Sequence, residues 1–160
     1  MMRLLISILF FMQWAYIPMA LAGDILKGFE AYNKGDYSGA FIEWEDLAAN
    51  GDAVAQSSLG IMYHLGQGVS QDDFKAFDLI NRSARQGFAP AQMSLGHFYE
   101  NGLGTIPDQA RAFMWFSIAA SSDKSAKALL ELLKAKMTAS DINAATALYD
   151  QCLKSKRTKC

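Results

Sequence analysis

The side chains that could carry out catalysis or bind a metal ion are few in this chain of 160 residues. His64 and His97 are its two histidines, and no Cys, Asp or Glu cluster with metal-ligand spacing accompanies them. Ser58 and Ser94 lack the Gly-x-Ser-x-Gly turn that exposes the nucleophile of many hydrolases. We therefore interpret both histidines as solvated or groove-facing side chains, and we expect neither a metal ion nor another cofactor.

Two Gly-x-Gly segments, at residues 66–68 and 102–104, have the look of phosphate-binding loops. A dinucleotide fingerprint needs a third glycine and a preceding strand. Each of these segments instead joins two stretches with helical periodicity. We therefore interpret both as turns between helices.

Cys152 and Cys160 are the only cysteines, so a single intrachain pairing is possible. In an oxidising compartment a disulfide would tie residues 153–159 back to the last predicted helix. A loop this short contributes about 2.5 kcal/mol in the chain-entropy model. The alternative is a buried thiol at Cys152 with an exposed one at Cys160, and we favour the disulfide.

The first 22 residues have the pattern of a secretory signal peptide. They carry one charge, Arg3, followed by an apolar stretch at residues 4–14 and the ending Ala20-Leu21-Ala22. This pattern predicts cleavage after Ala22 and a secreted or periplasmic protein. The alternative is a retained membrane anchor, but the apolar stretch is shorter than the roughly 20 residues that a spanning helix needs. We expect no stable membrane insertion after cleavage.

The mature chain would be weakly acidic. Of 15 Lys and Arg residues, Arg3 leaves with the signal peptide, so 14 remain against 16 Asp and Glu, a net charge of −2. Nucleic-acid binding calls for a clustered basic face, which this sequence lacks. Valine occurs only at Val54 and Val69, while Ala and Leu are plentiful, and this composition favours helices over strands.

A repeat organises the middle of the chain. Residues 52–87 and 88–123 align without a gap at an offset of 36, with thirteen identical pairs. Such a period is typical of helical solenoids. The pairs are Ala53/Ala89, Ala55/Ala91, Gln56/Gln92, Ser58/Ser94, Leu59/Leu95, Gly60/Gly96, Tyr63/Tyr99, Gly66/Gly102, Gly68/Gly104, Asp72/Asp108, Ala76/Ala112, Phe77/Phe113 and Ala84/Ala120.

Each unit should contain two helices. The spacing predicts a first helix over residues 53–65 and a second helix that begins after an N-cap at Asp72. Gly60 lies inside the first helix, where glycine costs about 1 kcal/mol relative to alanine. Because this glycine recurs at Gly96, we predict that the backbone of a neighbouring helix comes too close to leave room for a Cβ.

The flanking segments complete the domain organisation. Residues 23–51 match the same unit with a shorter inner turn, and Asp36 is the expected N-cap of its second helix. Residues 124–160 lack the pattern, and Thr138 with Asp141 predicts a capping box for the last helix. We predict an all-α protein, an α/α solenoid of about four antiparallel helical hairpins: a signal peptide at 1–22, a truncated repeat at 23–51, repeats at 52–87 and 88–123, and a C-terminal capping hairpin and tail at 124–160.

The repeated motif resembles the Sel1-like repeat. Its fixed positions are the Ala-x-Ala-Gln start, the Leu-Gly pair, the Tyr, the Gly-x-Gly turn, the Asp cap and the Lys/Arg-Ala-Phe segment, seen here from Ala53 to Phe77 and from Ala89 to Phe113. The resemblance implies right-handed superhelices of paired helices, similar to tetratricopeptide arrays, which serve mostly as adaptors and scaffolds. It also implies a link of some secreted bacterial members to β-lactam binding or hydrolysis, and it supplies no catalytic residue.

We accordingly expect a non-enzymatic module that binds a protein or peptide partner on its concave face, lined by the first helix of each unit. The alternatives are a β-lactam- or cell-wall-active hydrolase, by family analogy alone, and a structural or oligomerising module. The candidate partner-binding residues are the positions of the first helices that differ between the units: Ile61, Met62, His64, Met93, His97, Phe98 and Glu100.

Overall fold

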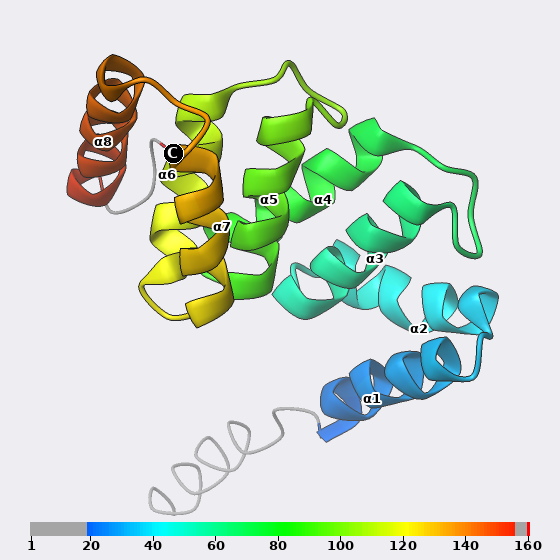
Figure 1. The fold of residues 1–160 in the computed structure, drawn as a ribbon. Helices are drawn as coiled ribbons and strands as arrows, with labels where there is room; N and C mark the ends of the chain where they lie inside the picture. Colours follow the sequence, from blue (N-terminus) through cyan, green and yellow to red (C-terminus); the bar gives the residue numbers. More distant parts are fainter. Residues whose placement is uncertain (1–18, 156–159) are drawn as a thin grey trace, which may run out of the picture.

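The computed structural model describes residues 19–155 and Cys160, and all of its regular secondary structure there is helical (Figure 1). The helices are α1 (Met19–Asn33), α2 (Tyr37–Ala49), α3 (Ala53–Leu65), α4 (Asp73–Arg85), α5 (Ala89–Asn101), α6 (Gln109–Ala120), α7 (Lys124–Lys134) and α8 (Ala139–Lys154). Most of the predicted signal peptide, residues 1–18, lies outside the described residues. In the described part, no helix combines the length and the apolar character needed to cross a bilayer.

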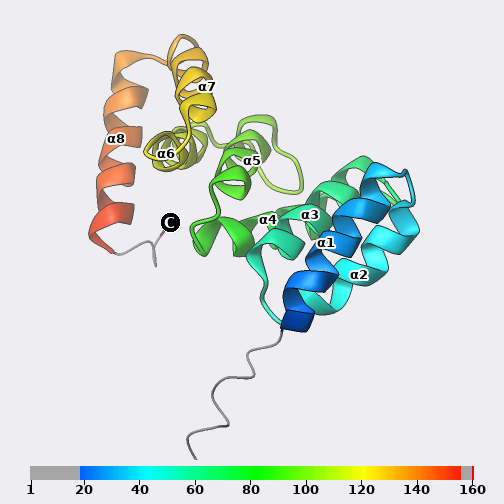
Figure 2. The ribbon, with the colours of Figure 1, turned by 90° about the horizontal axis from the view of Figure 1, so that it is seen from below.

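Three helical hairpins stack in sequence order, which confirms the predicted solenoid. The pairs α1–α2, α3–α4 and α5–α6 pack within themselves, and α2–α3, α4–α5 and α6–α7 join one unit to the next. The last two helices depart from this scheme, because α8 packs extensively against α6 and at most weakly against α7. Figure 2 shows α6 between α7 and α8.

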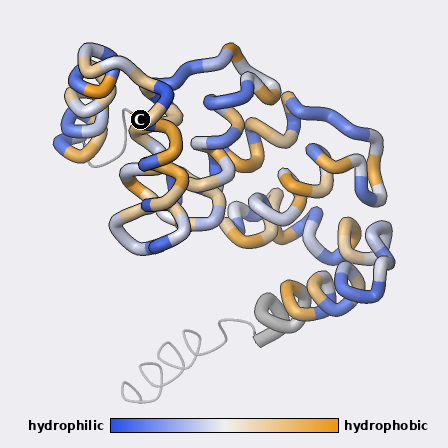
Figure 3. The backbone as a smooth tube through the Cα atoms, viewed as in Figure 1, coloured by the Kyte–Doolittle hydropathy of each residue, from blue (hydrophilic) through white to orange (hydrophobic). Residues whose placement is uncertain are grey.

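The helices begin where the sequence places their caps. The carboxylates of Asp36, Asp72 and Asp108 each accept a hydrogen bond from the backbone N–H three residues on, at the starts of α2, α4 and α6. Thr138 and Asp141 form the predicted capping box at the start of α8. The helices carry both apolar and polar residues (Figure 3). The apolar residues lie on one side of a helix, and these sides meet in the core.

The repeated glycines of the first helices mark close packing inside each hairpin. A Cβ at Gly60 would lie 2.7 Å from Cγ1 of Ile80, and one at Gly96 would lie 2.5 Å from Cε1 of Phe116. The prediction of a close neighbour is therefore correct, but the nearest atoms belong to a side chain of the partner helix. At Gly60 the backbone of the partner helix comes next, because the Ala76 carbonyl oxygen would lie 3.2 Å from the added Cβ.

The Gly-x-Gly turns hold successive units together, as expected of turns rather than phosphate loops. Gly68 and Gly104 have φ values of 71° and 61°, which favour glycine. A Cβ at Gly68 would lie 2.8 Å from the backbone of Tyr37, at the start of α2, and a Cβ at Gly104 would overlap the backbone of Asp73, at the start of α4. Each turn thus packs on the second helix of the preceding unit.

The paired glutamines explain another of the identities. Gln56 and Gln92 are 4% and 2% exposed, and their Nε2 atoms donate to the carbonyl oxygens of Ala48 and Ala84, at 3.1 and 3.3 Å. These carbonyls belong to the last turns of α2 and α4, where each also accepts a hydrogen bond from a backbone N–H just past the helix end, that of Gly51 or Gly87. A buried side-chain amide in each unit therefore closes the end of the helix before it.

Candidate functional site

The equivalent positions of α1, α3 and α5 define the first candidate surface. These helices end at residues 33, 65 and 101, so the offset is 32 from α1 to α3 and 36 from α3 to α5. The shorter first offset reflects the shorter turn between α1 and α2. In this register Gly28 corresponds to Gly60, and a Cβ at Gly28 would likewise overlap Trp44, the counterpart of Ile80.

The same register places Phe29, Ile61 and His97 at one position of three successive units. We call these three residues the A-face ladder. Phe29 and Ile61 are each 38% exposed, and the side chain of His97 is 49% exposed. A large side chain therefore faces solvent at the same point of every unit, and two of the three are apolar.

A small cavity opens beside the first two rungs of the ladder. It has a volume of about 130 Å³ and lies between α1, α2 and α3. Its lining is largely apolar and consists of Phe29, Tyr32, Trp44, Ser58 and Ile61. The rings of Phe29 and Trp44 meet edge to face, with centroids 5.0 Å apart. The cavity is preformed and has room for one apolar side chain.

The polar residues beside the ladder are held by partners. His64 Nδ1 lies 2.6 Å from Oδ1 of Asp73, and the His64 ring packs 5.2 Å from that of Phe98. Further along, Lys136 Nζ donates to Oε1 of Glu100 at 2.8 Å. This end of the face is therefore polar and fixed in geometry, whereas the α1–α3 end is apolar.

The structure separates the predicted partner-binding residues into two groups. Ile61, His64, Met93, His97 and Glu100 keep at least part of their surface in solvent. Met62 and Phe98 do not, because Met62 is fully buried and Phe98 is 5% exposed, each within a core cluster. These two residues are thus a correction: the variation between units at this position reflects repacking of the core.

Phe29 and Tyr32 are the members of this surface that the sequence analysis did not find. Both are half-buried or exposed and line the cavity. The sequence does contain the information needed to find them. Aligning Gly28 with Gly60, at an offset of 32 and not 36, makes Phe29 the counterpart of Ile61.

A second hollow, which we call the α2–α4 groove, opens between α2 and α4 above α3. It has a volume of about 280 Å³. Phe41, Leu59, Tyr63 and Leu79 supply its apolar surface, and the rings of Phe41 and Tyr63 meet edge to face at 5.9 Å. Both Phe41 and Tyr63 are only partly buried. Charged side chains line the groove as well: Glu45, Lys75, Asp78 and Arg82.

Two observations concern the side chains that were considered for catalysis or metal binding. The Ser94 hydroxyl donates to the carbonyl oxygen of Pro90 at 3.1 Å, so it bonds to the backbone of its own helix and not to a base. Within residues 19–155 and Cys160, no group of three His, Cys, Asp or Glu side chains could hold a metal ion.

Burial raises the pKa of Tyr99, whose ring packs against that of Phe77 in the core, with the two ring centroids 5.3 Å apart.

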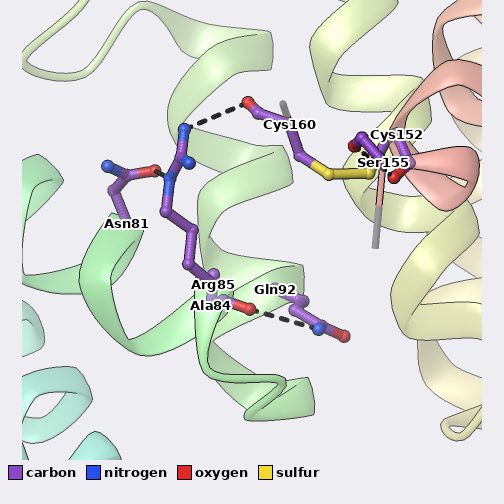
Figure 4. Close-up of a disulfide and its surroundings, with 7 residues drawn as sticks. All are labelled: Asn81, Ala84, Arg85, Gln92, Cys152, Ser155 and Cys160. Carbon is purple, nitrogen blue, oxygen red and sulfur yellow. Dashed lines mark hydrogen bonds between the residues drawn. A yellow bond between two sulfur atoms is a disulfide. The ribbon is translucent and has the colours of Figure 1, made fainter. Parts of the chain in front are cut away.

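The chain end is fixed by the predicted disulfide. Cys152 and Cys160 are bonded, with their Cα atoms 5.0 Å apart (Figure 4). Cys152 is fully buried and Cys160 packs against the same core cluster. The pair therefore anchors the end of the chain to α8, and free thiols are excluded in this structure.

Comparison with known proteins shows which family of repeats these units match. The family model of the Sel1 repeat matches residues 53–88 and 89–124. Each match begins and ends one residue later than the predicted unit. A relative described as an exopolysaccharide production negative regulator of Rhizobium leguminosarum bv. viciae is 38% identical over 65 residues, which cover 40% of this chain and 24% of the relative.

Two solved structures have the same architecture. A protective antigen of uropathogenic Escherichia coli with an SLR fold superposes with a TM-score of 0.79 and 27% identity, over 84% of this chain and 30% of that one. A Sel1 repeat protein from Oxalobacter formigenes gives a TM-score of 0.65 and 30% identity, over 69% of this chain and 46% of that one. The chain spans less than half the length of each of these three relatives.

Proposed function

Residues 53–124 belong to the Sel1 repeat family, and from this we propose that the protein is a non-enzymatic binding module for a protein partner. The partner contacts the concave face formed by the first helix of each unit, at the A-face ladder. The relative that is described as a regulator of exopolysaccharide production also fits a role that is exerted through binding.

One observation carries this proposal. Phe29 and Ile61 are exposed apolar side chains at equivalent positions of adjacent units, and they flank a preformed apolar cavity. Exposed apolar residues that gather around a cavity are typical of an interaction site. An apolar side chain of the partner enters the cavity between them. The side chains of His64 and Glu100, each held by its own hydrogen-bond partner, border the polar end of the interface.

The disulfide supports a location outside the cytoplasm. Disulfides persist in secreted and periplasmic proteins, because the cytosol keeps most thiols reduced. The Cys152–Cys160 bond is compatible with that setting. We propose that the partner is met there, in the cell envelope or outside the cell.

Photo-crosslinking followed by affinity measurement tests the proposal. A photoreactive amino acid at position 61 should capture the partner from a native extract, whereas the same residue at position 74 should not, because Phe74 is 78% exposed on α4 and lines neither hollow. With the captured partner purified, Ile61→Gln should raise Kd at least tenfold, in the range of a central interface residue. Its melting temperature should stay close to that of the parent. Equal capture at both positions, or an unchanged Kd, would contradict the proposal.

A further inference from the structure

Charge is distributed unevenly along the chain. The first unit, residues 23–51, has two basic and six acidic side chains, a net charge of −4, whereas residues 124–160 have eight basic and three acidic side chains, a net charge of +5. The two middle units, residues 52–87 and 88–123, have three basic against four acidic and one basic against three acidic side chains. Figure 1 and Figure 2 both place the first hairpin and the last two helices at opposite ends of the molecule. The protein is therefore acidic at one end and basic at the other.

The basic side chains of the middle units are largely paired within their own helices or caps. On α4, Arg82 forms an ion pair with Asp78 one turn before it. Lys75 Nζ lies 3.6 Å from a carboxylate oxygen of Asp72, and Arg111 lies at the same distance from the equivalent cap residue of α6. These units therefore present little unbalanced charge to a partner.

The outward face of α2 carries unpaired acidic residues instead. At the offset of 36, Ile42 and Asp46 stand where α4 has Asp78 and Arg82, so an apolar residue and a lone carboxylate replace an ion pair. Ile42 is 69% exposed, and Glu45 and Asp46 are exposed on either side of it. Neither carboxylate has an ion-pair partner in the part of the chain that the structure describes. We call Ile42, Glu45 and Asp46 the acidic end face.

Helix α7 presents the opposite charge at the other end of the molecule. One side of α7 packs on α6, and the other side faces solvent because α8 packs mainly on α6 as well. Lys124 and Lys127 are exposed there, without an ion-pair partner among the described residues, and Leu132 is 63% exposed. Glu131 lies on the same side, but its carboxylate accepts a hydrogen bond from Lys134 Nζ at 2.9 Å. We call Lys124, Lys127 and Leu132 the basic end face.

We propose that the acidic end face of one copy of this protein binds the basic end face of a second copy, head to tail. Charge complementarity selects this occupant, because each face combines one exposed large apolar residue with two unpaired charges, and the charges of the two faces are opposite in sign. Two acidic faces repel each other, so the contact is not symmetric. Each copy therefore binds a neighbour at both ends, and the contact extends into a chain or closes into a ring.

The helices that carry the two faces can pack closely. Ala49 follows Glu45 by one turn on α2, and Ala128 lies one turn after Lys124 on α7; both alanines are exposed. Small residues at these points let α2 of one copy approach α7 of the next, with Ile42 and Leu132 covering each other's neighbours. The contact uses no residue of the A-face ladder, so it goes beyond the proposed function. An assembly of this kind presents several ladders side by side, which strengthens binding to a partner with repeated sites.

Sedimentation velocity of the oxidised protein at increasing protein concentration tests the proposal. At a salt concentration of about 0.01 M the average mass should rise above that of the monomer as protein concentration increases. At about 1 M salt it should return to the monomer, because the screening length falls from about 30 Å to about 3 Å.

Two double variants locate the contact. Glu45→Gln with Asp46→Asn removes the charge of the acidic end face, and Lys124→Gln with Lys127→Gln removes that of the basic end face. Each should raise the Kd of self-association about tenfold or more. Each should also leave the melting temperature unchanged, because the four side chains are exposed and unpaired. An equal mixture of the two variants retains one intact acidic and one intact basic face, so it should form a dimer that grows no further.

Two controls separate this contact from a general effect of charge and from the ladder. Lys75→Gln with Arg111→Gln removes the same charge from the middle units and should leave self-association unchanged. Ile61→Gln should leave it unchanged as well, so a failure here would not bear on the ladder. A parent protein that stays monomeric at low salt overturns the proposal. So does a double variant of either end face that associates like the parent, or a mixture of the two that forms no dimer.

Discussion

Replacing Gly96 by alanine tests the packing rule on which the array depends. In a solvent-exposed helix this change stabilises by about 1 kcal/mol, because alanine loses less backbone entropy than glycine. Here the new Cβ would lie 2.5 and 2.6 Å from Cε1 and Cδ1 of Phe116. Carbon atoms pack at about 3.5–4.0 Å, so the ring or the helix must move by about 1 Å.

The ring has little room for that movement, since Phe116 is fully buried and the His97 ring packs against it at 5.5 Å. Overpacking of a well-filled core costs about 1–3 kcal/mol, and a rigid ring places this case near the upper end. After the propensity gain is subtracted, Gly96→Ala should lower the free energy of unfolding by about 2 kcal/mol. At about 3 °C per kcal/mol for a chain of this size, the melting temperature should fall by about 6 °C.

A double-mutant cycle with Phe116→Leu identifies the obstacle. Leucine is smaller and more flexible than phenylalanine, so Gly96→Ala should cost less in that background, with a coupling energy of about 1–2 kcal/mol. Gly60→Ala provides the comparison, because its obstacle is the more pliable Ile80 side chain, and it should destabilise less than Gly96→Ala. Urea unfolding followed by circular dichroism measures all five proteins. A neutral or stabilising Gly96→Ala, or strictly additive effects in the cycle, would refute the idea that close packing explains the recurrent glycine.

Two further predictions concern the chain end and the core. Replacing Cys152 and Cys160 together by serine should lower the free energy of unfolding under oxidising conditions by about 2.5 kcal/mol, and reduction of the parent protein should lower it by a similar amount; equal stability with and without reductant would contradict this. Burial raises the pKa of Tyr99 above its unfolded value of about 10, so the stability due to its neutral phenol is present below pH 10 and is lost as the pH rises through the folded pKa. Urea unfolding at increasing alkaline pH should therefore show the parent losing stability relative to Tyr99→Phe, and parallel pH curves for the two proteins would show that the phenol is not desolvated.

The local features of the fold could be predicted from the sequence because each rests on a few neighbouring residues. Asp72 and Asp108 accept the hydrogen bonds of their caps from residues three positions along, and the repeat fixes which helices pair. The offset of 36 also exposed Gly60 and Gly96 as packing positions. The shorter inner turn of the first unit was predicted, but its first helix was not aligned residue by residue, so Phe29 was not recognised as the counterpart of Ile61.

The burial of Met62 and Phe98 could not be predicted from the pattern. A position that differs between two units was interpreted as a surface position, but a buried position can also vary when its neighbours vary with it. Met62 packs in one cluster and Phe98 in the other, so each fits different surroundings. Variation between repeats therefore distinguishes surface from core only when hydrophobic character is considered as well, and both of these residues are apolar.

The sequence analysis predicted that the last two helices close the array as a hairpin, whereas α8 packs mainly against α6. Its apolar stripe with Ala145 and Cys152 suits packing on α7 as well as packing on α6, so helical periodicity alone could not decide between a closing hairpin and a helix that folds back. The deciding information was in α6, where Met114 and Ile118 replace the Asp78 and Arg82 of the preceding unit. Two apolar residues at positions that are charged one repeat earlier indicate a surface that something covers.

This comparison between units also bears on which surfaces bind partners. Where a position is covered by the chain itself, as at Met114, the residue is apolar, and where the equivalent position is open, as at Asp78, it is charged. The A-face ladder breaks this relation, since Phe29 and Ile61 are apolar and still exposed to solvent. Folding alone gives no reason for that exception, because a polar residue such as His97 occupies the third rung without harm to its helix. A partner that covers the first two rungs accounts for it by the same rule that α8 follows on α6.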